Sequence, residues 1–147
     1  MKVEIDQSGR LEYTSVPTVI GDSLGNSLLL KAVDKQYIQK VFRQIGKPRM
    51  FVIETFSFLT ALTISQSYTE ENIYVIDTEY PGKDGEIKTN LFRFLPRLRC
   101  YLPSYAVSFK QIGKKSKAHT TVYNHYVRPQ KFPKRIITKE KVLEFLI

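Results

Sequence analysis

The sequence has few of the residues that mark several common protein classes. Its single cysteine, Cys100, excludes an internal disulfide and a multi-cysteine zinc site, and it fits a reducing cytoplasm. No run of 18 apolar residues occurs, so a membrane-spanning helix is not expected. Glu4 follows the first methionine almost at once, which is unlike a signal peptide. We therefore expect a cytoplasmic protein without a membrane partner.

Acidic residues are scarce relative to basic ones. The 147 residues include 23 Lys and Arg but only 14 Asp and Glu, giving a net charge of +9. An excess of this size in a small protein favours a polyanion partner, although an ordinary basic surface is the alternative. Hydrophobic residues make up 42% of the chain, enough for a real core, so we expect one domain over residues 1–147.

Hydrophobic patterning predicts an α/β fold in which a three-strand antiparallel meander is followed by alternating helices and strands. Such an order implies a mixed sheet with antiparallel and parallel strands, flanked by helices. Residues 128–147 form a basic C-terminal extension with a short helix. The expected strands are 3–6, 10–14, 27–33, 73–77, 105–112 and 135–137, with 18–20 continuing the early pairing, and the expected helices are 34–45, 50–66, 82–95, 117–127 and one beginning after Thr138.

Two of the predicted strands end in an acid. Asp6 closes the apolar pattern of residues 3–6, and Asp77 closes the continuous apolar run 73–76, which is typical of a buried strand. Open α/β sheets place their chemistry at the carboxyl ends of strands. Two carboxylates at the tips of core strands are what a divalent-metal site requires. We expect Glu79, two residues beyond Asp77, to point to solvent or to act only as a support for the ligands.

This order and two short motifs resemble the ribonuclease H-like superfamily, over roughly residues 1–128. The motifs are Ile-Asp-Gln-Ser-Gly-Arg at residues 5–10 and Tyr-Val-Ile-Asp-Thr-Glu-Tyr at residues 74–80. The resemblance implies a further acid on a helix, for which Glu54 is the candidate. No acid lies between Lys110 and Lys139 to complete the set, but His119 lies on the last core helix. Argonaute slicer domains and excision-repair nucleases of this superfamily are similar, because their last ligand is a histidine. The implied ligands of Mg²⁺ or Mn²⁺ are Asp6, Glu54, Asp77 and His119.

Basic residues flank the proposed ligand on the last core helix and could hold phosphates of a nucleic acid. They are Lys114, Lys115 and Lys117, with Lys131, Lys134 and Arg135 in the tail. Each assignment has a simpler alternative. Asp6 and His119 could be a turn residue and an ordinary helix residue, Glu54 could be a surface acid, and the lysines could form a solvated loop. We expect His125 to be exposed, and Tyr123 and Tyr126 to be core residues rather than base-stacking platforms.

Together these features predict a metal-dependent nuclease that hydrolyses phosphodiester bonds by a two-metal mechanism. A non-catalytic nucleic-acid-binding module with the same fold is the first alternative, and a small viral or mobile-element interaction protein is the second. Other site classes find little support, because the chain has neither a G-x-x-x-x-G-K-[ST] phosphate loop nor a G-x-S-x-G nucleophile elbow.

Overall fold

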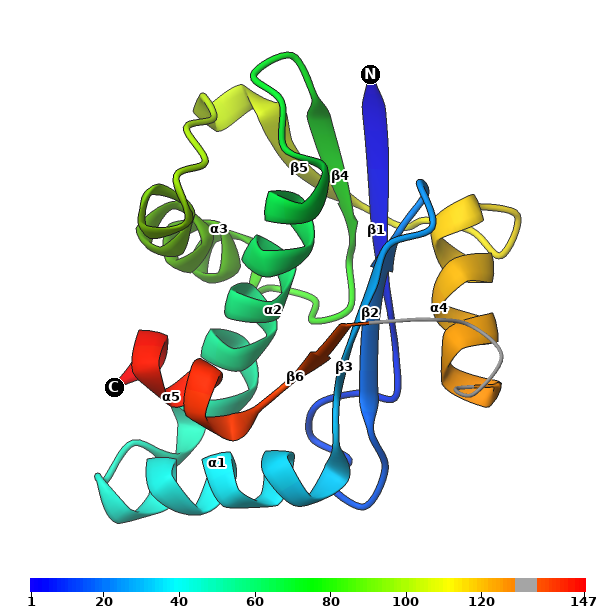
Figure 1. The fold of residues 1–147 in the computed structure, drawn as a ribbon. Coiled ribbons are helices and arrows are strands. Elements are labelled where there is room, and N and C mark those ends of the chain that lie inside the picture. Colours follow the sequence, from blue (N-terminus) through cyan, green and yellow to red (C-terminus); the bar gives the residue numbers. More distant parts are fainter. Residues whose placement is uncertain (129–134) are drawn as a thin grey trace.

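A computed structural model describes residues 1–128 and 135–147 as a six-stranded mixed sheet flanked by five α-helices (Figure 1). The strands lie in the order β5-β4-β1-β2-β3-β6 across the sheet. The strands are β1 (Lys2–Ser8), β2 (Thr18–Asp22), β3 (Ser27–Leu30), β4 (Ile73–Asp77), β5 (Val107–Lys110) and β6 (Arg135–Ile137). The helices are α1 (Ala32–Gln44), α2 (Phe51–Ser67), α3 (Asp84–Phe94), α4 (Lys117–Val127) and α5 (Lys139–Leu146).

The pairing of the strands confirms the mixed sheet that the sequence predicts. Strands β1, β2 and β3 form an antiparallel meander, whereas β4 lies parallel to β1 and β5 lies parallel to β4. Ile5 is paired with Ile76, so the next residue on each strand is an acid, Asp6 on β1 and Asp77 on β4. The register therefore brings these two acids to neighbouring positions at one edge of the sheet.

The helices divide unequally between the two faces of the sheet (Figure 1). Helix α4 covers one face, where Val122 packs with Val19 and Leu29 of the sheet. The other helices cover the opposite face, with α2 at their centre and buried along most of its length. This position explains why α2 is apolar all round and why length, rather than periodicity, identified it as a helix. Among the described residues, no helix has the length and apolar character needed to cross a membrane.

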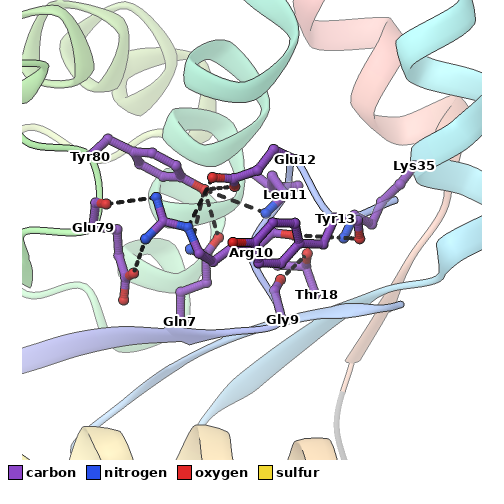
Figure 2. A network of polar contacts seen from close by, with 10 residues as sticks. All are labelled: Gln7, Gly9, Arg10, Leu11, Glu12, Tyr13, Thr18, Lys35, Glu79 and Tyr80. Atoms are coloured by element: carbon purple, nitrogen blue, oxygen red, sulfur yellow. Dashed lines mark hydrogen bonds and ion pairs between the residues drawn. The ribbon is translucent and has the colours of Figure 1, made fainter. Parts of the chain in front are cut away.

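The strand expected at residues 10–14 is wrong, because this segment is a chain of turns between β1 and β2. Its backbone carbonyls are satisfied by a side chain instead of a neighbouring strand. The fully buried ammonium of Lys35, from α1, donates to the carbonyl oxygens of Arg10, Tyr13 and Val16 at 2.8–3.0 Å. Figure 2 shows Lys35 beside Arg10 and Tyr13. The middle strand of the meander is Thr18–Asp22, directly after Pro17.

Most other limits lie within a few residues of the predictions, but the strand expected over residues 27–33 ends at Leu30 because a helix begins two residues later. Helix α1 begins at Ala32, two residues before the expected cap Asp34, which instead lies in the first turn, where its charge favours the helix dipole. Ser116 caps α4 by accepting a hydrogen bond from the amide of Ala118, and Thr138 caps α5 through the amide of Lys141. The expected C-terminal extension adds β6 to the sheet beside β3 and packs α5 against α1 and α2.

Candidate functional site

Three carboxylates converge at the edge of the sheet where β1 and β4 end. One oxygen from each of Asp6, Asp77 and Glu79 lies within 4.8 Å of the other two. Asp6 and Asp77 arrive there because their strands are parallel neighbours, as the sequence predicts. We call these three residues the carboxylate cluster.

Glu79 is the member of the carboxylate cluster that the sequence pattern missed. The expectation that it points to solvent or only supports the ligands is wrong, because its carboxylate lies beside those of Asp6 and Asp77. Strand β4 ends at Asp77, so the backbone after it sets the direction of Glu79. Beyond that point the amide of Glu79 donates to the carbonyl oxygen of Asp77 at 2.9 Å, which closes a three-residue turn around Thr78. The turn directs Glu79 back toward Asp77. Pro81 and Gly82 gave the available signal, since they indicate that the strand ends before them.

Crowding perturbs the protonation of the carboxylate cluster. Burial, followed by hydrogen bonding to and repulsion from Asp77 and Asp6, raises the pKa of Glu79 to about 9. Arg10 only partly offsets this effect, because its guanidinium is 3.7 Å from the Glu79 carboxylate. Glu79 is therefore protonated near neutral pH, and a cation bound beside it would favour its charged form.

His119 reaches the carboxylate cluster from the helix on the other side of the cleft. Its Nδ1 is 3.1 Å from Oδ2 of Asp6, and its side chain is about one-third exposed (36%). Asp6 Oδ1 accepts the amide of Gln7 at 2.8 Å, and Asp77 Oδ1 accepts the amide of Ile112 at 2.7 Å. These backbone bonds fix the orientation of both carboxylates and leave further lone pairs for a ligand. The structure thus brings Asp6, Asp77 and His119 to one cleft.

The cluster lines an open cleft of about 400 Å³. Its lining comes from β1, from the end of β4 and the turn after it, from the loop before α4, and from α4 itself. Lys114 is the only lysine or arginine among the described residues of the lining. The full lining consists of Asp6, Gln7, Asp77, Thr78, Glu79, Gln111, Ile112, Gly113, Lys114 and His119.

Glu54 lies elsewhere, and the structure does not bring it to the carboxylate cluster. It is in the first turn of α2, and its carboxylate accepts a hydrogen bond from Arg93 of α3 at 2.7 Å. This ion pair provides the compensation that a buried acid in an apolar helix requires. The third acid of the carboxylate cluster is Glu79 and not Glu54.

The predicted nucleic-acid residues separate into three groups. Lys114 lies in the cleft, and Lys115 and Lys117 are exposed beside it. Arg135 begins β6, which pairs with β3 on the far side of the sheet from β4. Lys131 and Lys134 lie outside the described residues.

The aromatic and imidazole side chains of α4 differ from two expectations. His125 is buried rather than exposed, and its Nδ1 is hydrogen-bonded to the hydroxyl of Ser27. Tyr126 packs against the small core under α4, as expected, but Tyr123 is exposed.

No family model, curated protein or solved structure matches this chain. The resemblance to ribonuclease H-like proteins that the sequence motifs indicate therefore stays a prediction.

Proposed function

We propose that the protein is a metal-dependent nuclease of the ribonuclease H-like kind, which hydrolyses phosphodiester bonds of a nucleic acid. The observation that carries this proposal is the convergence of Asp6, Asp77 and Glu79 within 4.8 Å at the carboxyl ends of two adjacent parallel strands. The sheet order supports it, because a central β1 flanked by an antiparallel β2 and a parallel β4 is what the proposed fold requires.

The donor set fits a hard divalent cation. Three carboxylates supply the oxygen ligands that Mg²⁺ prefers, and the imidazole of His119 is tolerated by Mn²⁺ as well. The raised pKa of Glu79 supports the same conclusion, because burial and the neighbouring Asp77 and Asp6 disfavour its charged form, which a bound cation would stabilise. A bound ion, or a pair of ions, would lower the pKa of a water molecule and neutralise charge on the phosphate.

The chain's own residues have separate tasks in this proposal. Lys114 lies in the cleft, where its ammonium can bind a non-bridging phosphate oxygen. His119 holds Asp6 in place through the 3.1 Å contact. Arg10 donates to the backbone carbonyl of Glu79 at 3.0 Å, which fixes the turn that points this carboxylate into the cluster (Figure 2). No acid occurs from residue 110 to residue 138, so the approach along α4 attracts a polyanion.

Asp77→Asn tests the proposal with little disturbance of the fold. The amide oxygen of Asn can still accept the hydrogen bond from the amide of Ile112, whereas its charge for the metal is lost. We expect the wild type to cut RNA or DNA with Mn²⁺ or Mg²⁺, and Asp77→Asn to bind nucleic acid but not cut it. The exposed Glu70→Gln is the matched control and should cut normally. Equal cleavage by Asp77→Asn would reject the assignment.

A non-catalytic nucleic-acid-binding module is the second candidate, and the net charge of +9 is the observation that favours it. This candidate predicts salt-sensitive binding that is the same with and without Mn²⁺, and no cleavage. A binding titration with and without the metal separates the two functions, and absence of polyanion binding at low salt would reject both.

A further inference from the structure

Tyr123 is an exposed aromatic residue at the border of the candidate site. It lies one helical turn after His119 on α4, and 55% of its surface is accessible to solvent. Its ring lies nearly parallel to that of His119, with an interplanar angle of 18° and 6.4 Å between ring centroids. Since the His119 ring contacts Asp6, the Tyr123 ring is one aromatic ring away from the carboxylate cluster.

The helix that carries Tyr123 is held firmly against the sheet. Ala118, Val122 and His125 are the buried residues of α4, and Tyr126 packs beside them over the small core. Tyr123 takes no part in this packing, so its exposed ring face is not needed to hold α4 in place. A rigid helix that presents an open aromatic face has little conformational entropy to lose when a flat ligand stacks on it.

The charges around Tyr123 define the class of ligand. From residue 110 to residue 128 the chain has five lysines and arginines and no acid. Lys114 lies in the cleft before α4, and Lys117 is exposed in its first turn. An exposed aromatic ring bordered by cations is the arrangement with which proteins bind single-stranded nucleic acid, in which a base stacks on the ring and the cations neutralise the backbone.

We propose that Tyr123 is a stacking site for an unpaired nucleobase, so that the substrate is single-stranded where it crosses α4 beside the carboxylate cluster. Calling the ligand a substrate rests on the proposed nuclease function, but the stacking site itself does not depend on cleavage. Bases inside a duplex are stacked on each other and cannot offer a face to the tyrosine ring, whereas an unpaired base can.

The test compares three variants in binding assays with EDTA, so that no cleavage occurs. The probes are fluorescein-labelled single strands of RNA and DNA and a blunt duplex of the same length, measured by fluorescence anisotropy. Tyr123→Ala should weaken single-strand binding by about 5–150-fold, the range that corresponds to one stacked base. Tyr123→Phe keeps the ring and should bind as the wild type does. Duplex binding should stay within about twofold of wild type, because it depends on the cations alone.

Tyr105→Ala is the matched control. Tyr105 is 80% exposed but lies just before β5, at the amino end of the strand and therefore opposite the edge that carries the carboxylate cluster. It should bind both probes normally. Equal thermal unfolding midpoints for wild type, Tyr123→Ala and Tyr105→Ala would show that the comparison is between folded proteins.

The outcomes separate this inference from the nuclease proposal. Unchanged single-strand binding by Tyr123→Ala, or an equal loss with the duplex, overturns the stacking site, even if the protein cleaves nucleic acid. A selective loss with single strands supports the stacking site, even if no metal ion supports cleavage, and in that case only the nuclease proposal fails. An equal loss in Tyr105→Ala also overturns the inference, since the effect would then not belong to this site.

Discussion

Replacing Glu79 by Gln should make the metal-free protein more stable and make a divalent cation less effective at stabilising it. The wild-type carboxyl has an ordinary pKa of 4.5, and burial beside Asp77 and Asp6 raises it to about 9 in the folded protein. Between these two pH values the folded state holds a proton that the unfolded state has released. The free energy of unfolding therefore falls as the pH rises through this window. Gln is nearly isosteric and carries no charge at any pH, so the substituted protein has no such loss.

The size of the effect at pH 7 follows from the ordinary pKa. Keeping a carboxyl of pKa 4.5 protonated at pH 7 costs about 3 kcal/mol. Glu79 keeps some contact with solvent, which reduces this to about 1–3 kcal/mol. For 147 residues, the melting temperature of metal-free Glu79→Gln should then be about 3–10 °C above that of the wild type. The difference should disappear near pH 4, where the unfolded chain also holds the proton.

Thermal unfolding followed by circular dichroism, in EDTA and then with Mn²⁺, measures both parts of the prediction. A cation present at about 100 times its Kd adds about 2.7 kcal/mol to the stability of a folded protein that binds it. We expect this gain in the wild type and a clearly smaller one in Glu79→Gln. Glu70→Gln makes the same chemical substitution at an exposed position and should alter neither melting temperature. The reasoning is refuted if metal-free Glu79→Gln at pH 7 is no more stable than the wild type.

Two further predictions concern the segment between β1 and β2. Lys35→Met should lower the free energy of unfolding by about 2–4 kcal/mol, because the carbonyls of Arg10, Tyr13 and Val16 lose a buried ammonium donor. The exposed Lys40→Met on the same helix is the control and should cost less than about 0.5 kcal/mol in urea unfolding. Gly9→Ala should cost more than Gly25→Ala. Both glycines have positive φ, but only at Gly9 would an added Cβ overlap a backbone carbonyl oxygen, and about 1 kcal/mol is expected at Gly25. Equal losses at the two glycines would contradict the overlap.

Regular elements and the acids at their ends could be predicted from the sequence, because both depend on local patterns. A continuous apolar run with an acid at its end predicts a buried strand and the place of Asp77, and the capping residues Ser116 and Thr138 give the first residues of α4 and α5. The meeting of Asp6 with Asp77 required one further assumption, that β1 and β4 are parallel neighbours. The structure confirms this assumption.

The residues that could not be predicted have environments set by side chains distant in the sequence. Periodicity predicts a strand over residues 10–14 because polar and apolar residues alternate there, which would place Leu11 and Tyr13 on one buried face. In the structure Leu11 is buried but Tyr13 is exposed. Nothing local shows that Lys35, more than 20 residues later, is the donor for this backbone. The assignment of Glu54 to the site failed because its partner is also distant in the sequence. Its burial indicates a partner, but the sequence cannot tell a metal ion from the guanidinium of Arg93.

The irregular segment between β1 and β2, residues 10–16, is connected to the carboxylate cluster by side-chain contacts. Lys35 holds the segment by its carbonyls, and the segment carries Arg10, whose guanidinium lies over the Tyr80 ring at 4.8 Å and donates to the backbone carbonyl of Glu79 (Figure 2). The third carboxylate is therefore held near two others by contacts outside the sheet, although burial and repulsion oppose its charge. Natural proteins usually keep an unfavourable arrangement of this kind where function requires it. The energetic cost of placing Glu79, rather than the presence of acids at strand ends, is what distinguishes this cleft from an ordinary acidic surface.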